Sequence, residues 1–395
     1  MRKDWEYKKL GEVATFNRGL TYSGKDEVDF SENIVLRSNN IDIDSNTLNL
    51  NELKYISDEI IIPKDKRLKR NSIFICMSNG SKQHLGKVAF IDKDYSYAFG
   101  GFMGLISPEE KSLIPKFLYY FLCSTKFKLF LTIIGNGANI NNIKFSDISK
   151  VNLPLPQKST QLSIVAELDK INELIQLKKQ QLKDYDQLAQ SIFYEMFGDP
   201  VENEKGWEVK KLGEISTIER GSGISKKDFC SAGLPCIHYG QIHTSFGAYT
   251  KEVLSFIPEN LLPKYKYASR GDLVMAITSE DVEGSCKSTT WLGNYDVVIG
   301  SDAAICHHSQ DGIYLSYYTR TKAFYNEKAK YAKGFKVTHI STKEIASIPV
   351  PLPPLPLQQQ FAARIEAIER QKQQVSETIK DLETLLASRM QYWFD

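Results

Sequence analysis

The sequence predicts an α+β protein in which two similar globular domains alternate with two long helices packed as an antiparallel coiled coil. Three observations lead to this prediction: a repeat about 200 residues apart, a proline-rich extended segment closing each copy, and a coiled-coil-like apolar pattern after it. The length agrees, because a chain of 395 residues holds roughly two or three domains of ordinary size.

The first element is the opening of each copy. Residues Trp5–Gly19 match Trp207–Gly221 at an offset of 202, with ten of fifteen positions identical. Gly137–Pro156 matches Gly334–Pro353 at an offset of 197, so the second copy carries a few small deletions. Such self-similarity indicates a duplicated structural unit. We expect globular domains at 1–155 and 199–353.

A long helix follows each globular copy. Each copy ends in Pro-x-Pro, where the proline ring disfavours helix just before it, and then becomes helical. We expect helical spacers at 156–198 and 354–395, the first ended by Gly198-Asp199-Pro200. At about 1.5 Å per residue, each helix would span roughly 50–55 Å.

Apolar residues recur along both helices at alternating spacings of three and four, which is typical of a coiled-coil seam. A core helix within each globular domain remains the alternative. Polar seam positions Lys178, Lys372 and Arg389 would fix the register or face another protein. The apolar seam residues are Leu168, Ile171, Ile175, Leu182, Tyr185, Ile192, Ile365, Ile368, Val375, Ile379, Leu382 and Leu386.

Composition excludes several classes of protein. With 42% hydrophobic and 25% charged residues, the chain is typical of a folded globular protein. Lysines interrupt the most apolar stretch of the chain, residues 113–135, so no membrane span is expected. The N-terminal residues show no signal-peptide pattern, and we therefore expect a cytoplasmic protein. Six cysteines without a CxxC spacing favour reduced thiols. A net charge of only +2 means that any nucleic-acid-binding surface has to be a local patch.

The repeat as a whole resembles the DNA-specificity subunits of type I restriction-modification systems. Each copy opens with Trp-Glu-x-Lys-Lys-Leu-Gly-Glu and closes with an Ile-rich stretch, Pro-x-Pro, a glutamine (Gln161, Gln358) and a long helix. The resemblance covers nearly the whole chain. It departs from the family pattern just before the glutamine, where Thr160 and Leu357 replace an acidic residue, which leaves the helix start open.

The resemblance implies a function for each part. Two target-recognition domains would each read half of a bipartite, asymmetric site in double-stranded DNA. The helices would set the spacing and bind two modification subunits, which methylate adenine with S-adenosylmethionine. Restriction and motor subunits, with ATP and Mg, would join for cleavage. The chain itself would be non-catalytic.

Candidate DNA contacts lie in polar loops that differ between the copies. Arg and Lys suit guanine, Asn and Gln suit adenine, and other cations bind phosphates. The alternative is that short polar runs are only turns between strands. The candidates for base readout are Arg37, Ser38, Asn39, Asn40, Asn79, Ser81, Lys82, Gln83 and His84, with His238, Tyr239, Gln241, His243, Ser279 and Lys287 in the second copy.

Two further segments are candidates for the same surface. The basic run 64–70 offers Lys66, Arg67 and Lys69 to phosphates, although a solvated strand entry explains it equally well. The Asn-rich segment 135–142 and its more basic counterpart 333–339 occupy equivalent positions in the two copies. Their candidates are Asn139, Asn141, Lys333 and Lys336.

Catalytic and metal motifs are not expected. The segment 19–26 nearly forms a phosphate loop, but Asp26 replaces the Ser or Thr that binds magnesium. Cys230, Cys236, His238 and His243 lack zinc-ligand spacing. Three alternatives stay open: the specificity component of a related two-subunit or fused restriction system, a protein-binding scaffold, and a stand-alone methyltransferase or nuclease.

Overall fold

Two structural units make up the fold, and each contains parts of both long helices. The computed structural model describes residues 5–43, 45–81, 84–135, 142–261, 263–332 and 337–395. Unit 1 comprises Met1–Lys179 and Glu377–Asp395, and unit 2 comprises Gln180–Ser376. The mixed architecture with two repeated domains confirms the predicted fold class.

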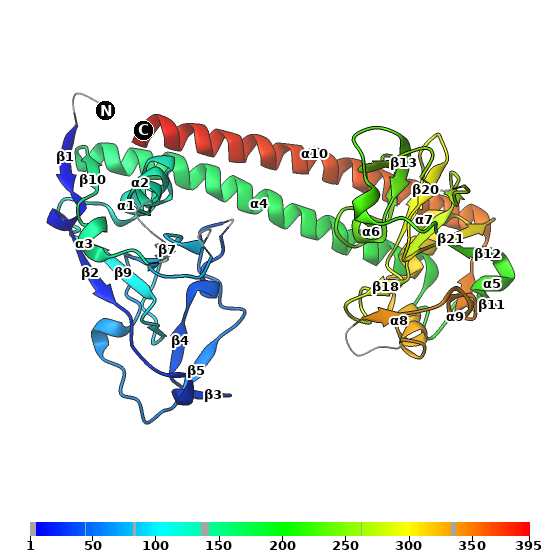
Figure 1. The fold of residues 1–395 in the computed structure, drawn as a ribbon, viewed down its shortest axis with the longest axis horizontal. Helices are drawn as coiled ribbons and strands as arrows, with labels where there is room; N and C mark the ends of the chain where they lie inside the picture. Colours follow the sequence, from blue (N-terminus) through cyan, green and yellow to red (C-terminus); the bar gives the residue numbers. More distant parts are fainter. Residues whose placement is uncertain (1–4, 44, 82–83, 136–141, 262, 333–336) are drawn as a thin grey trace. The chain divides into compact units, whose positions relative to one another are not determined.

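In its described residues, unit 1 contains two four-stranded sheets and a two-stranded ribbon (Figure 1). The first sheet is antiparallel in the order β2–β9–β6–β7, and the second has the order β3–β5–β4–β8. The strands are β1 (Glu6–Lys9), β2 (Ala14–Arg18), β3 (Glu27–Val28), β4 (Ile34–Leu36), β5 (Lys54–Ile56), β6 (Ser72–Cys76), β7 (Val88–Ile91), β8 (Ala98–Phe99), β9 (Met103–Pro108) and β10 (Asn152–Leu155).

Short helices cover the antiparallel sheet of unit 1. They are α1 (Pro115–Cys123), α2 (Thr125–Gly135) and α3 (Phe145–Ile148). Phe117 and Phe121 of α1 are fully buried in one core together with Ile73 and Ile75 of β6. Every side chain of β6 is buried, and after Ser72 the strand is apolar from Ile73 to Cys76, as a strand covered on both faces requires.

Unit 2 repeats this plan with more strands. Its described residues form a five-stranded sheet, β12–β21–β17–β19–β14, a four-stranded sheet, β15–β13–β20–β16, and two ribbons. The strands are β11 (Glu208–Lys211), β12 (Ser216–Arg220), β13 (Leu234–Ile237), β14 (Tyr249–Thr250), β15 (Ser255–Ile257), β16 (Tyr267–Ala268), β17 (Leu273–Ala276), β18 (Thr278–Ser279), β19 (Ser288–Trp291), β20 (Val297–Ile299), β21 (Ala303–His308), β22 (Thr338–His339) and β23 (Pro349–Leu352). The short helices are α5 (Leu212–Ile215), α6 (Tyr239–Thr244), α7 (Gly312–Tyr318), α8 (Lys322–Ala329) and α9 (Thr342–Ala346).

The two sequence motifs that define the repeat pair with each other. In unit 1 the opening motif forms β1 and the Pro-x-Pro segment forms β10, with Tyr7 opposite Pro154. In unit 2, β11 pairs with β23 in the same way, with Val209 opposite Pro351. Proline lacks a ladder donor, so its place in a two-stranded ribbon is one that it tolerates. The ribbon therefore joins the start of each copy to its end.

A buried glutamine fastens each long helix to its globular domain. Gln161 is fully buried, accepts from the backbone N–H of Ile114 and donates to the carbonyls of Ser112 and Pro156. Gln358 is equally buried and accepts from the N–H of Asp311. The helices begin at matching positions, because α4 spans Lys158–Phe197 and α10 spans Leu355–Phe394, both bounds 197 apart.

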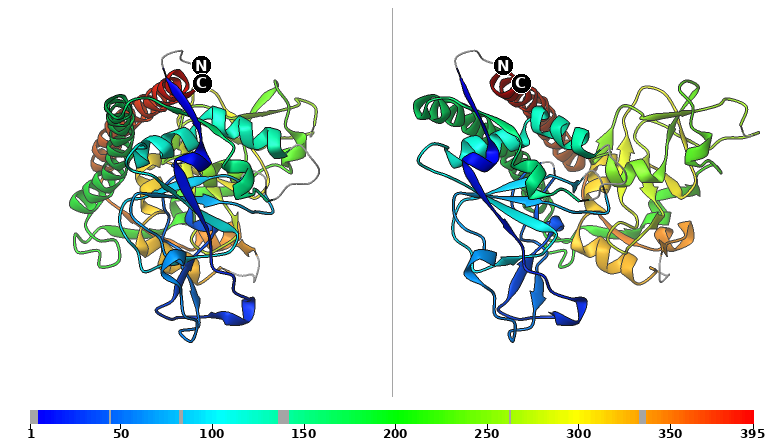
Figure 2. Two further views of the ribbon diagram at one scale, coloured as in Figure 1. Left: turned by 90° about the vertical axis from the view of Figure 1, so that its left-hand side faces the viewer. Right: turned by 60° about the vertical axis from the view of Figure 1, so that its left-hand side comes forward.

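Within each unit, the segments of α4 and α10 lie side by side and antiparallel (Figures 1 and 2). Glu167 pairs with Arg389 and Lys179 with Glu383 in unit 1, so positions rise along one helix as they fall along the other. In unit 2, Lys372 pairs with Asp186. Each predicted seam residue is buried or half-buried. Arg389 and Lys372 do form ion pairs between the helices, as a register-fixing role requires.

The ends of the long helices depart from the predicted seam. The seam pattern continues through Ile192 and Met196, whereas the structure buries Phe193 and Phe197 to 2% and 3% exposure. A straight helix drifts relative to a 3.5-residue repeat. At its end α4 also packs against the core of unit 2, and aromatic contacts there select a different face.

Among the described residues, no single helix has both the length and the apolar character to cross a membrane. Only the pair Pro115–Cys123 and Thr125–Ile134 reaches that threshold when joined, and it is bent by 62° at the break.

Candidate nucleic-acid interface

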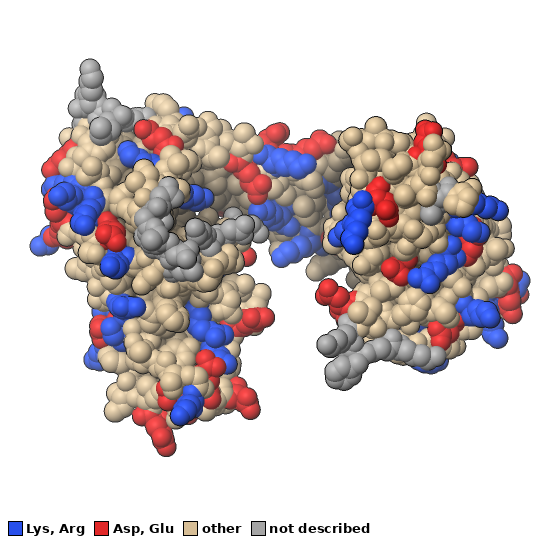
Figure 3. Space-filling model, viewed as in Figure 1, with Lys and Arg blue, Asp and Glu red and all other residues tan. Residues whose placement is uncertain are grey.

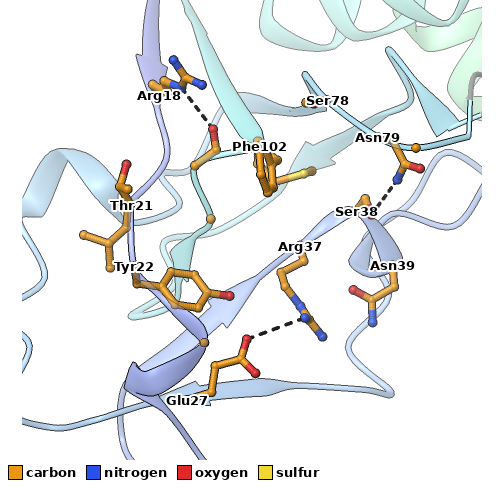
Figure 4. A pocket seen from close by; sticks show the side chains of 16 residues that line it. Arg18, Thr21, Tyr22, Glu27, Arg37, Ser38, Asn39, Ser78, Asn79 and Phe102 are labelled. Atoms are coloured by element: carbon orange, nitrogen blue, oxygen red, sulfur yellow. Dashed lines mark hydrogen bonds and ion pairs between the residues drawn. The ribbon is translucent and has the colours of Figure 1, made fainter. Parts of the chain in front are cut away.

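A pocket of about 740 Å³ in unit 1 collects several of the predicted DNA contacts (Figure 4). Four loops from separate strands line it, including the segments 37–39, 78–80 and 100–103. Arg37, Ser38, Asn39 and Asn79 all face this pocket. The fold thus brings together loops that are about 40 residues apart in the sequence.

Arg37 is held at the pocket by charge and by its backbone. Its guanidinium Nη1 lies 4.0 Å from Glu27 Oε1, and Glu27 also pairs with Lys54 at 2.5 Å. The backbone N–H of Arg37 donates to Asn40 Oδ1 at 2.8 Å. The Arg37 side chain stays 45% exposed, so its remaining donors are free to reach a base edge.

The pocket loops 37–39 and 78–80 are joined by one side-chain hydrogen bond. Asn79 Nδ2 donates to Ser38 Oγ at 2.9 Å, and Asn79 Oδ1 accepts from the backbone N–H of Ser81. By contrast, Asn40 is 1% exposed and its amide donates to the carbonyls of Asn49 and Glu52. Asn40 therefore shapes the loop from beneath.

Unit 2 has a corresponding pocket of about 910 Å³. His238 stands where unit 1 has Arg37, and its N–H donates to Gln241 Oε1 at 3.0 Å, the bond that Asn40 provides in unit 1. Burial lowers the pKa of the His238 imidazole below its usual value, and Lys226 lowers it further. His238 is thus neutral near pH 7, and because its Nδ1 accepts from the N–H of Gly240 at 3.2 Å, its Nε2–H is the donor that remains for a ligand.

A lysine side chain donates to a backbone carbonyl in or just after the pocket loop in both units. Lys87 Nζ donates to the carbonyl of Ile41, and Lys287 Nζ donates to that of His243, each at 2.7 Å. Burial lowers the pKa of both ammonium groups, and nearby Arg320 lowers that of Lys287 further. Lys287 also lines its pocket, together with Tyr239, His243 and Ser279 from the predicted set.

The predicted phosphate contacts of the basic run have mixed surroundings. Lys66 Nζ donates to the carbonyl of Arg18 at 2.7 Å, and Arg67 Nη1 donates to that of Ser96 at 2.8 Å. Lys69 is exposed, as is Ser81, while His84 is half-buried. Lys82, Gln83, Asn139, Asn141, Lys333 and Lys336 lie outside the described residues.

Basic and acidic side chains are interspersed on the face of each unit seen in Figure 3. No broad basic area gathers on the described residues of that face, in line with the net charge of +2. Recognition would therefore depend on the local pockets. Over the described part of the chain, no group of three or more His, Cys, Asp or Glu residues is placed to hold a metal ion.

Several pocket residues were missed by reasoning from sequence. Arg18 and Phe102 line the pocket of unit 1, and Arg320 and Lys328 line that of unit 2. Arg18 aligns with Arg220 in the repeat, and Phe102 follows a Gly-Gly pair. Those signals were present, but only the fold shows that these residues border the loops at 37–39 and 78–80.

Comparison with known proteins gives consistent matches. A family model described as "Type I restriction modification DNA specificity domain" matches residues 2–184 and 204–384. The EcoKI specificity subunit of Escherichia coli K12 is 24% identical over 388 residues, covering 92% of this chain and 82% of that protein. The putative MjaX specificity subunit of Methanocaldococcus jannaschii is 23% identical, covering 97% and 93%.

Two solved structures share the fold. One chain, from a study of assembly and conformational transition of the type I R-M system, superposes with a TM-score of 0.59 at 20% identity, covering 100% of this chain and 98% of that one. The type I restriction-modification S subunit from M. genitalium gives a TM-score of 0.53 at 14% identity, covering 98% and 95%.

Proposed function

This chain belongs to the type I restriction-modification DNA specificity family, and from that premise we propose that its two units read the two halves of a bipartite, asymmetric DNA site. The role of the chain in such a system is DNA recognition. An asymmetric site requires two unlike reading surfaces, since identical copies would demand a palindrome.

The observation that carries this proposal is a pair of pockets with matched frames and different side chains. Asn40 and Gln241 make the same loop-closing bond in the two units. The residue whose N–H donates in this bond differs: it is Arg37 in unit 1 and His238 in unit 2. Arg suits guanine, whereas the neutral His238 ring, whose Nδ1 accepts from the N–H of Gly240, offers a single donor at Nε2. Matched frames with different side chains are what two distinct half-sites need.

The predicted contacts divide into three roles. Exposed or pocket-facing groups read bases, cations of the basic run and Lys287 bind phosphates, and Asn40 and Gln241 support the loops. The proposed base contacts are Arg37, Ser38, Asn39, Asn79, Ser81, His84, His238, Tyr239, His243 and Ser279, and the proposed phosphate contacts are Lys66, Arg67, Lys69 and Lys287.

The long helices offer a surface for partner proteins. Leu174, Leu177, Leu188 and Leu385 are 36–57% exposed along α4 and α10. Exposed apolar side chains on helices are typical of protein contacts. We assign these faces to two modification subunits, which would use S-adenosylmethionine to methylate adenine, while restriction subunits with ATP and Mg would cut. The chain itself would catalyse neither reaction and would act in the cytoplasm.

Binding by the full chain tests DNA recognition directly. Filter binding to its methylation motif should be at least 10³-fold tighter than to random duplexes at physiological salt, and both should weaken steeply as salt rises. The motif comes from a genome-wide map of methylated adenines in cells that carry the chain and its modification partner. Equal affinity for all duplexes would contradict the proposal, and so would methylation or cutting by the purified chain alone.

Exchange of one reading domain tests the division into half-sites. Residues 20–135 replaced by the equivalent segment of a relative should change one half of the methylated motif and leave the other half as it was. A change in both halves would rule out independent reading.

A further inference from the structure

A turn that lines the pocket of unit 1, and whose counterpart in unit 2 contacts the pocket residue Thr278, makes the same close backbone approach in both units. A Cβ added to Gly19 would lie 2.0 Å from the carbonyl oxygen of Gly100, and one added to Gly221 would lie 2.2 Å from that of Gly300. Only glycine permits so close an approach. Hydrogen bonds fix the turn further, from Gly100 N to Leu36 O and from Gly300 N to Ile237 O, each at 2.9 Å.

The residue two positions after Gly100 or Gly300 is also held through its backbone. The carbonyl of Phe102 accepts from the N–H of Met77, and the carbonyl of Asp302 accepts from that of Ile277, each at 2.9 Å. The carbonyls at positions 102 and 302 are thus anchored by equivalent bonds, although only Asp302 has a left-handed backbone, with a φ of 59°. The side chain remains the variable part.

In unit 1 that variable side chain is a large exposed aromatic. Phe102 is 70% exposed and lines the pocket together with Arg37 and Asn79 (Figure 4). It makes no ring contact with another described aromatic residue. An exposed phenyl ring on an anchored backbone, among hydrogen-bonding groups, is suited to cover an apolar group on a ligand.

In unit 2 the same position holds a charged pair. Asp302 Oδ1 lies 3.0 Å from Arg220 Nη2 and 3.3 Å from Thr278 Oγ1. Arg220 remains 57% exposed. A carboxylate that orients an exposed guanidinium prepares it for bidentate contact with the O6 and N7 of guanine.

We propose that positions 102 and 302 are specificity-determining: Phe102 packs against the C5-methyl group of a thymine in one half-site, and Asp302 positions Arg220 against a guanine in the other. This inference rests on the proposed function, since it names bases within the half-sites. A thymine methyl is the one apolar group on the major-groove edges of the four ordinary bases, and Phe is among the side chains that contact it.

Thymine and uracil differ only by that methyl group, so they test Phe102 directly. The full chain, as Phe102→Ala, as Phe102→Leu and unaltered, would be titrated with duplexes carrying its methylation motif. Each thymine of one half-site is replaced by uracil in turn. Loss of one buried methyl should weaken binding of the unaltered chain about fourfold at a single position. The Ala variant should respond less than twofold there, and the Leu variant should retain part of the response.

Asp302→Asn serves as the matched variant in unit 2. Asn tolerates the left-handed backbone at this position, where φ is 59°, so the turn is preserved. In methylated-adenine maps, Phe102→Ala should relax one position in one half of the motif, and Asp302→Asn should relax a guanine in the other half. Circular dichroism spectra and melting temperatures equal to those of the unaltered chain establish that the variants fold.

The possible failures are distinguishable. If uracil weakens binding of the unaltered chain and of Phe102→Ala equally, or at no position, the thymine contact is wrong while sequence recognition stands. If Asp302→Asn leaves the motif unchanged, the guanine contact is wrong. If the unaltered chain does not prefer its motif to random DNA, the proposed function itself fails.

Discussion

The ring of Phe394, at the end of α10, lies 5.3 Å from the ring of Phe117 in α1, measured between centroids. Phe197, its counterpart at the end of α4, lies 4.8 Å from the ring of Tyr314 in α7. Each globular domain is thus closed by the helix that follows the other one. The pattern is reciprocal, because Phe117 and Tyr314 are themselves 197 residues apart.

Removal of the Phe394 ring should destabilise unit 1. Phe394 is 2% exposed, and truncation of a buried Phe to Ala typically costs about 3–5 kcal/mol. Phe394→Ala should lower the free energy of unfolding by that amount in denaturant titrations. Tyr392→Ala, at a side chain 56% exposed, is the control and should cost far less. Equal losses would contradict the closing role of Phe394.

Gln161→Leu should also destabilise unit 1, for a different reason. The substitution leaves the N–H of Ile114 and the carbonyls of Ser112 and Pro156 without the side-chain partner they have now. An unsatisfied buried polar group costs about 1–3 kcal/mol. We expect a loss of at least this size in thermal or chemical unfolding. Gln190→Leu, on an exposed face of α4, should change stability by less than about 0.5 kcal/mol.

The ion pair between Glu167 and Arg389 predicts a pH dependence. The hydrogen bond from Arg389 lowers the pKa of Glu167 below its usual value, and one from Trp393 adds to this. A lowered folded-state pKa means that the pair contributes fully above the unfolded pKa of about 4.3 and is lost as pH falls through the folded value. Because both side chains are about one-third exposed, the contribution should stay below about 1 kcal/mol.

Glu167→Gln isolates that contribution. The variant should be less stable than the unaltered chain at pH 7, and the difference should shrink as pH falls below about 4. Unfolding measured between pH 2.5 and 7 gives the comparison. A difference that grows on acidification would have the wrong sign for this pair.

Arg37 and Lys69 should affect DNA binding in different ways. Arg37→Ala should cost about 1–3 kcal/mol and relax one position of one half-site, and Arg37→Lys should recover little because lysine lacks the paired donors. Lys69→Ala should weaken binding to all sequences alike and reduce the slope of log K against log salt by about 1. Binding assays over a salt series separate the two. A motif altered by Lys69→Ala would refute its assignment to phosphate.

An insertion in α4 should alter the distance between half-sites. Four extra helical residues add about 6 Å at 1.5 Å each. The tolerated gap in the methylated motif should grow by roughly one to two base pairs at about 3.4 Å per step. Substitution of four exposed residues of α4 without insertion is the control. An unchanged gap would show that the helices do not set the spacing.

Sequence reasoning predicted the plan of the fold because its signals are local or repeated. The Pro-x-Pro segments, the long helices and the glutamines at 161 and 358 all recur at one offset, and the structure places them at equivalent positions. The pairing of β1 with β10 was not predicted. It joins residues almost 150 positions apart, and no local pattern encodes such a contact.

The candidate site was only partly predictable. Arg37, Asn79 and His238 stood out as polar groups in loops, and the structure brings each of them to a pocket. Asn40 stood out equally, yet its amide is consumed by backbone carbonyls, because residue type alone does not reveal burial. Phe102 was overlooked since an isolated phenylalanine suggests a core residue, and only the structure shows it 70% exposed.

The make-up of unit 1 has a consequence for synthesis of the protein. Its helical pair includes Glu377–Asp395, and Phe394 lies in its core. The amino-terminal domain therefore cannot complete its packing while the ribosome is still translating the segment that supplies these residues. Until Phe394 has been synthesised, Phe117 and its neighbours remain exposed to solvent. During that time a chaperone, or the helix end of another nascent copy, can bind the site on the core that Phe394 later fills.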